Sequence, residues 1–199
     1  IKTVVAIFLS PMIGFAIAML LMLVTSWLFR GVQPRHAKGA FKGLHLVSSA
    51  AYSISHGGND AQKTMGVIAV LLYSTGYLKG EFHVPEWVVL SCYLAIALGT
   101  LSGGWRIIRT MGSKLTKLNH HSGFCASTAG SIVVFGASAM GIPISTTHAI
   151  TGSVVGTGAA RRASAVRWSI ASRVIVAWFI TIPASALVAA AFYLLTRLF

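Results

Sequence analysis

The chain has 199 residues, of which 55% are hydrophobic and only 10% are charged. A soluble globular domain carries about 25% charged residues, so this composition excludes an ordinary water-soluble domain and indicates a membrane protein. The net charge of +13 does not indicate nucleic-acid binding, because the basic residues gather in short segments between apolar stretches and do not interleave with aromatic residues on a polar surface.

The first apolar stretch, residues 3–29, carries no charge and is followed by Arg30. About 20 apolar residues cross a bilayer as a helix, so we expect a first crossing here, with Pro11 and Gly14 permitting a bend. The stretch is too long for a signal peptide and lacks the small-residue cleavage site. We therefore expect a genuine span, in a chain that begins upstream of Ile1.

Residues 43–78 are mostly apolar but are interrupted by the run His56-Gly57-Gly58-Asn59-Asp60. Neither helix propensity nor contact with lipid favours this run, so we expect two helical pieces joined by an unwound break, with Gly57 and Gly58 as its hinge. The two pieces together make one net crossing. The loop over residues 79–86 lacks a basic bias and is expected outside, and residues 87–105 form the return crossing.

Basic residues concentrate in three segments, residues 30–42, 106–122 and 161–167, which we expect to be cytoplasmic loops because such loops carry an excess of Lys and Arg. Between the last two, residues 123–160 carry no formal charge and are split at Gly141-Ile142-Pro143. Both ends of this stretch adjoin basic segments. It therefore makes either two crossings or a re-entrant hairpin of two short helices, and the sequence leaves both open.

Residues 168–196 form the last predicted span, with Pro183 as a kink. The length allows five or six crossings. The predicted fold class is therefore all-α: a polytopic membrane helical bundle with broken or re-entrant helices, forming a single transmembrane domain over residues 1–199. Cys92 and Cys125 show no metal or redox spacing and are expected to be packing residues.

Asp60 is the only acidic residue outside the loop that contains Glu81 and Glu86. A carboxylate at membrane depth costs about 3 kcal/mol on insertion scales, so it normally has a partner or marks a pathway. One interpretation is a structural ion pair with Lys63 on the same helical face. The other is functional: Asn59 and Asp60 offer oxygen atoms beside a helix break, where secondary transporters bind their ions.

Three hydroxyl residues, Ser145, Thr146 and Thr147, follow Pro143 at the point where a helix would begin. Free backbone N–H groups and the positive end of the helix dipole at this position make a cradle for an anion. The simpler interpretation is an ordinary helix cap by Ser145. The surrounding residues are uncharged and predicted to lie in the membrane, which favours the functional interpretation.

An oxyanion such as phosphate needs several hydroxyl and N–H donors and some positive charge when it leaves water. The Asp60 carboxylate would repel it, unless Asp60 holds a co-transported cation such as Na⁺ or accepts a proton. Symport follows from this chemistry, and Lys63 adds positive charge. His56 and His148 flank the two runs as candidate proton relays or as packing residues. No nucleotide-binding motif and no nucleophile–base pair occurs, so no enzyme activity is expected.

The two polar runs together resemble those of the inorganic phosphate transporter (PiT) family, whose members carry a GxND run and a PxSTTH run in each of two inverted repeats. Here they are Gly57-Gly58-Asn59-Asp60-Ala61-Gln62-Lys63 and Pro143-Ile144-Ser145-Thr146-Thr147-His148. The resemblance covers essentially the whole chain, including residues 112–118 and 161–168. It implies the C-terminal repeat of a bacterial low-affinity phosphate permease, one half of an inverted-repeat transporter whose N-terminal repeat is missing.

The resemblance implies symport of phosphate, free or as a metal–phosphate complex, with H⁺ or Na⁺ and no resident cofactor, in the plasma (cell inner) membrane. It places phosphate at the residues Asn59, Gln62, Lys63, Ser145, Thr146 and Thr147, and the coupling cation at Asp60 and Asn59 with His56 and His148.

One departure is Ser127, where similar members carry an acidic residue. Alternatives are a permease for sulfate or arsenate, and a non-transporting subunit or decayed copy. Expected partners are the bilayer, the missing repeat and possible homodimer copies, with no nucleic acid.

Overall fold

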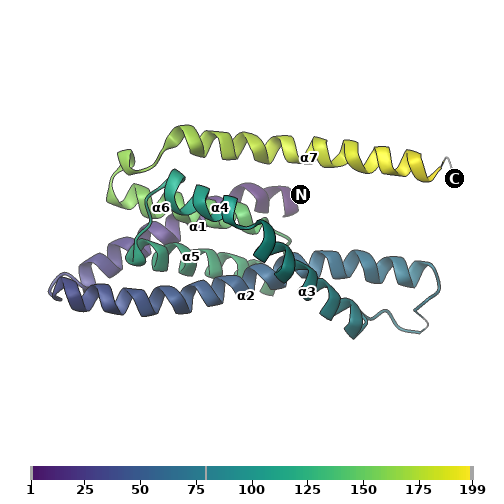
Figure 1. The fold of residues 1–199 in the computed structure, drawn as a ribbon, viewed down its shortest axis with the longest axis horizontal. Coiled ribbons are helices and arrows are strands. Elements are labelled where there is room, and N and C mark those ends of the chain that lie inside the picture. The colour runs from purple at the N-terminus through teal and green to yellow at the C-terminus, as the bar shows by residue number, and fades with distance from the viewer. Residues whose placement is uncertain (1, 79, 198–199) are drawn as a thin grey trace.

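The computed structural model describes residues 2–78 and 80–197, and no strand occurs in this part of the chain. The predicted all-α fold class is confirmed. In chain order the elements are α1 (Lys2–Leu28), α2 (Pro34–Ser74), α3 (Glu86–Gly103), α4 (Trp105–Arg109), the π-helix η1 (Thr110–Leu115), α5 (His120–Ala139), α6 (Thr146–Arg161), the 3₁₀ turn η2 (Ala163–Ala165) and α7 (Trp168–Thr196) (Figure 1).

α1, α2, α5 and α6 form the core of the bundle (Figure 1). α1 packs along α6, α2 packs along α5, and α5 also contacts both α1 and α6. α3 packs against the second half of α2, where Ala61 and Met65 meet Val88 and Cys92. α7 runs along one edge of the bundle and buries little of its surface. The core thus brings the polar runs of α2 and α6 into one assembly.

Small residues set a very close approach between α1 and α6. A Cβ atom added at Gly152 would overlap the backbone of Pro11, and one at Gly156 would overlap the backbone of Phe15. Small residues allow helix backbones to approach this closely in membrane proteins, where van der Waals packing replaces the hydrophobic effect. This contact fixes α6, and with it the position of Thr146 at its start.

The predicted break in residues 56–60 is wrong, because α2 continues as one helix from Pro34 to Ser74. A helical glycine costs about 1 kcal/mol, so the cost at Gly57 and Gly58 is modest. Contacts within the helix from His56 to Asp60 and from Asp60 to Lys63 offset this cost, as does packing of α2 against α5. Apart from the local backbone of α2, no atom lies within 4 Å of a Cβ built at either glycine, so this face of α2 is open and the glycines do not form a hinge.

The predicted split near Pro143 is confirmed, because α5 ends at Ala139 and α6 begins at Thr146. Gly141 makes the turn with a φ of 64°, which favours glycine. α6 has 16 residues and is therefore about 24 Å long, less than the roughly 30 Å of a bilayer's hydrocarbon core. This length favours a hairpin with one short helix over two complete crossings.

Four of the described helices are long and apolar enough to cross a membrane: residues Val4–Leu28 of α1, and α3, α5 and α7. Their outer faces expose many large apolar side chains, as expected for surfaces that contact lipid or another part of a membrane protein. The spans predicted at residues 3–29, 87–105 and 168–196 agree with these helices. The crossing within residues 43–78 stays a prediction, because α2 is not among the helices apolar enough to cross a membrane.

The three basic segments are more helical than expected of loops. α2 already includes residues 34–42, and α4, η1 and the first turn of α5 occupy much of residues 106–122. In the third segment Arg161 ends α6, and η2 follows. The membrane side on which these segments lie stays a prediction. Lys79, in the loop expected outside, lies outside the described residues.

Candidate functional site

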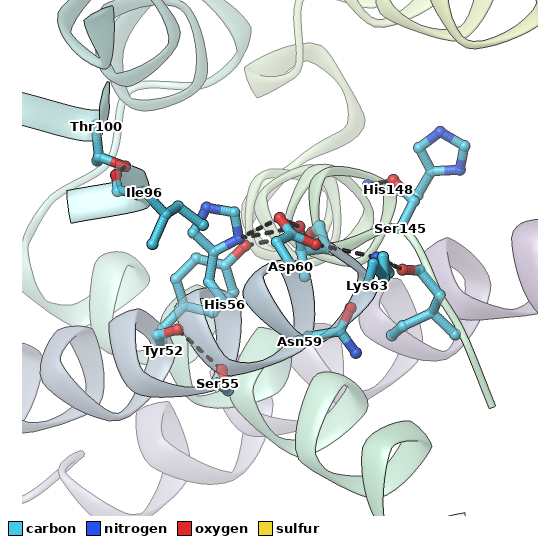
Figure 2. Close-up of polar contacts among 12 residues, drawn as sticks. Tyr52, Ser55, His56, Asn59, Asp60, Lys63, Ile96, Thr100, Ser145 and His148 are labelled. Carbon is cyan, nitrogen blue, oxygen red and sulfur yellow. Dashed lines mark hydrogen bonds and ion pairs between the residues drawn. The ribbon is translucent and has the colours of Figure 1, made fainter. Parts of the chain in front are cut away.

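The carboxylate of Asp60 faces the beginning of α6 (Figure 2). Its Oδ2 atom accepts a hydrogen bond of 3.0 Å from the Thr146 hydroxyl, and its Oδ1 atom accepts one of 3.0 Å from the Lys63 ammonium group. His56 Nδ1 lies 3.2 Å from Oδ2. The Asp60 side chain is 31% exposed, whereas Thr146 is only 2% exposed. The expected meeting of the two polar runs is therefore present.

His56 completes a triangle with Asp60 and Thr146. Its Nδ1 atom lies 3.0 Å from the Thr146 hydroxyl oxygen as well as near Asp60. A threonine hydroxyl has one proton to donate, and Thr146 directs it to Asp60. Nδ1 therefore acts as the donor in this geometry. Of the two flanking histidines, His56 is part of the cluster.

Lys63 connects α2 to the turn that precedes α6. Its ammonium group donates to the Ile144 carbonyl at 2.8 Å in addition to Asp60. The structural ion pair expected from the sequence is thus present, and it also ties α2 to the polar run of the other helix. Because Lys63 and Asp60 carry opposite charges, the pair is neutral as a unit.

The start of α6 contains the predicted cap. Ser145 Oγ accepts a hydrogen bond of 3.4 Å from the backbone N–H of His148, and the first backbone N–H groups of any helix lack intrahelical acceptors. A cavity of about 320 Å³ opens beside this turn. It is lined by Ile7, Asp60, Lys63 and residues 143–147. Hydroxyl, ammonium and carboxylate groups therefore share one small volume.

Three predicted site residues lie away from this cavity. Asn59 is buried and points toward α5, where its side-chain NH₂ group donates to Ser138 Oγ at 3.0 Å. Its side-chain oxygen, Oδ1, has no partner among the described residues. Gln62 is exposed and does not line the cavity. The ring of His148 stacks on Trp178 of α7, with centroids 3.8 Å apart, and points away from Asp60 (Figure 2).

Tyr52 is a residue of the cluster that the sequence reasoning missed. Its hydroxyl donates to the backbone carbonyl of Thr146 at 3.3 Å, and its ring lies parallel to that of His56. Tyr52, His56 and Asp60 are spaced four residues apart, which places them on one face of a continuous helix. The expected break concealed this signal, because it ended the helix before Asp60.

Ser127, the departure expected from the resemblance, lies within α5 and is partly buried. It does not line the cavity beside Asp60. Among the described residues, no three His, Cys, Asp or Glu side chains gather to hold a metal ion. A cation at Asp60 would therefore depend on hydroxyl and carbonyl oxygens, such as those of Thr146 and Ile144, for its remaining ligands.

A bundle of apolar helices that brings a carboxylate, an ammonium group and hydroxyls together at the contact between two of its members is the arrangement of a membrane transport protein. The chain matches the phosphate transporter family over residues 29–189, and it belongs to that family. This membership confirms the resemblance of the two polar runs.

The chain is similar to proteins named probable low-affinity inorganic phosphate transporters. It is 60% identical to the one from Rhizobium meliloti (strain 1021), covering 96% of this chain and 58% of the relative. It is 36% identical to the one from Bacillus subtilis (strain 168), covering 100% and 60%. These relatives are transporters by name, in agreement with the expectation that the chain is not an enzyme.

The fold is similar to that of a solved structure described as the sodium-dependent phosphate transporter. The TM-score is 0.73 at 25% sequence identity, covering 100% of this chain and 57% of that structure. The chain therefore spans less than two thirds of the length of these relatives and of this structure.

Proposed function

We propose that the complete protein is a symporter that moves inorganic phosphate across the cell's inner membrane with H⁺ or Na⁺, and that this chain supplies one half of its transport site. The observation that carries the proposal is the 3.0 Å hydrogen bond from the Thr146 hydroxyl to Asp60. It joins the one acidic residue of the bundle core to the hydroxyl-rich start of α6. Membership of the phosphate transporter family supports phosphate as the substrate.

The shared hydroxyl suggests how a cation and phosphate are coupled. Thr146 has a single proton, which it donates to Asp60 in this geometry. When Asp60 holds a proton or Na⁺, its demand for this donor falls, and the Thr146 hydroxyl can turn to a phosphate oxygen. Neutralising Asp60 also removes its repulsion of the anion. Cation and phosphate thus bind more favourably together than either does alone.

The remaining phosphate donors are at the same turn. Ser145 and Thr147 border the cavity together with the Lys63 ammonium group, and a helix N-terminus favours negative charge. In this proposal Asn59 and Gln62 do not touch phosphate in the conformation described above, because neither lines the cavity. The open face of α2 at Gly57 and Gly58 leaves room for further donors from other parts of the complete protein.

Uptake of labelled phosphate into liposomes that contain the full-length carrier tests the proposal. One arm imposes a Na⁺ gradient at fixed pH, and the other imposes a pH gradient without Na⁺. We expect one of these gradients to drive uptake, and we expect Asp60→Asn to abolish the dependence on it. Glu81→Gln is the matched control, because Glu81 is an exposed loop carboxylate and its loss should leave uptake unchanged.

Competition separates the alternative substrates and roles. Sulfate in large excess should leave phosphate uptake intact if the site selects phosphate, whereas strong inhibition by sulfate would favour a general oxyanion permease. A full-length carrier that inserts correctly and moves no phosphate under either gradient would contradict the proposal and favour a non-transporting subunit.

A further inference from the structure

A second cavity, of about 420 Å³, lies where α1 ends and where α2 and α5 begin. Its lining includes Lys38 of α2 and the adjacent His120 and His121 of α5, with Phe29 and Phe41 as apolar walls. Lys38 precedes Asp60 by about six turns of one continuous helix, a separation of about 33 Å. This cavity is therefore separate from the proposed transport site, and its volume is within the range of small-ligand sites.

The charged group of this cavity, the Lys38 ammonium, has no acidic partner in the lining. The three acidic residues of the chain are Asp60, Glu81 and Glu86, and none of them lines it. Among the described residues Lys38 makes no ion pair, and the ion pairs that do form use the carboxylate of Asp60. Lys38 is exposed, and its ammonium group can attract an anionic ligand that approaches the cavity from the membrane surface.

His121 links two of the helices that line the cavity. Its Nε2 atom lies 2.6 Å from the Thr25 hydroxyl, and its ring lies 4.2 Å from that of Phe41. Thr25 and Phe41 are both buried. The cavity is therefore built from packed side chains of three helices, and the exposed His120 remains available as a second donor beside Lys38.

The cavity lies at the end of a candidate membrane span. The apolar part of α1 ends at Leu28, one residue before the cavity wall at Phe29, and the neighbouring Trp27 is 75% exposed. Tryptophan is enriched at the interface between hydrocarbon and water, and basic pockets between helices near this interface bind anionic lipid headgroups. Exposed Val24 and Leu28 on the same end of α1 offer an apolar surface for an acyl chain.

We propose that this cavity binds the phosphate group of an anionic phospholipid, with Lys38 and His120 as its donors. The proposal is independent of transport, because it concerns a different cavity and a ligand that stays in the membrane. Free inorganic phosphate has the same donor requirements, so the experiment must separate the two sources.

The test measures the thermal unfolding midpoint of the full-length carrier in detergent, titrated with phosphatidylglycerol or with phosphatidylcholine. We expect phosphatidylglycerol to raise the midpoint more than phosphatidylcholine. In Lys38→Ala/His120→Ala, the phosphatidylglycerol concentration that gives half of this rise should increase at least ten-fold. Lys114→Ala, which removes one positive charge from an exposed position on η1, should retain the wild-type response.

Three results would overturn the proposal: an unchanged response in the double variant, an equal loss in Lys114→Ala, or a rise with inorganic phosphate that depends on Lys38 in the same way. The last result would assign the cavity to free phosphate. If the double variant does not purify folded, Lys38→Gln and His120→Gln measured singly provide the same comparison. Because the readout needs no transport, its outcome is separate from that of the symport proposal.

Discussion

Replacing Thr146 with valine removes one hydroxyl group while keeping the branched shape of the side chain. In the structure this hydroxyl donates to the Asp60 carboxylate, and in the proposed mechanism it passes to phosphate. A hydrogen bond to a charged group contributes about 1.5 to 3 kcal/mol. We therefore expect Thr146→Val to raise the KM for phosphate by about 10-fold to 150-fold. Since Asp60 retains Lys63 and His56, the fold should persist.

The assay is initial-rate uptake of labelled phosphate by the reconstituted full-length carrier, measured over a range of phosphate concentrations at saturating coupling cation. Thr146→Ser keeps the hydroxyl and should remain within a few-fold of wild type. Thr181→Val removes an exposed hydroxyl on α7, far along the chain from the site, and should have no effect. A Thr146→Val carrier with wild-type KM would refute the role given to this hydroxyl.

Three further changes probe the surroundings of the site. Gly152→Ala should lower the free energy of unfolding, measured by thermal unfolding, by about 1 to 3 kcal/mol, because its methyl group overlaps Pro11. Gly43→Ala is the control, because its methyl group contacts no neighbouring element and should not destabilise α2. Lys63→Gln should raise the KM for phosphate and lower the cation concentration for half-maximal uptake, since it removes positive charge and frees Asp60. If both quantities rose or both fell, the role given to the Lys63–Asp60 pair would be contradicted. Tyr52→Phe loses one neutral hydrogen bond and should change the KM by no more than about ten-fold, so a complete loss of uptake would show a larger role.

The long apolar helices could be predicted from the sequence because their signal is local and strong. Residues 3–29, 87–105 and 168–196 correspond closely to α1, α3 and α7. The split at residues 141–143 was also visible, since Gly141 and Pro143 favour a turn. The apolar spans are decided by composition, because few polar groups compete within them, and the split is decided by its turn residues.

The predicted break in α2 failed because the deciding contacts are spaced along a helix that the prediction had already ended. Gly57 and Gly58 weaken the helix locally, yet the contacts among His56, Asp60 and Lys63 all require helical spacing. Local propensity is a weak prior that tertiary packing overrides. The same error concealed Tyr52 as a neighbour of the site.

Other site assignments needed the positions of partners that the sequence cannot supply. The sequence places Asn59 beside Asp60, but the helix turns the two side chains about 100° apart, so Asn59 reaches Ser138 on α5. His148 follows the hydroxyl run directly, yet it stacks on Trp178 of a helix that comes later in the chain. Adjacency along a helix is thus a poor guide to which side chains share a cavity.

The most direct test of the account is the affinity of the purified full-length carrier for phosphate, measured by titration calorimetry with and without the coupling cation. In the wild type, the cation should strengthen phosphate binding, because neutralised Asp60 releases the Thr146 hydroxyl. In Asp60→Asn, the affinity should be the same with and without the cation. A cation dependence in Asp60→Asn as steep as in the wild type would contradict the coupling of cation and phosphate through this pair.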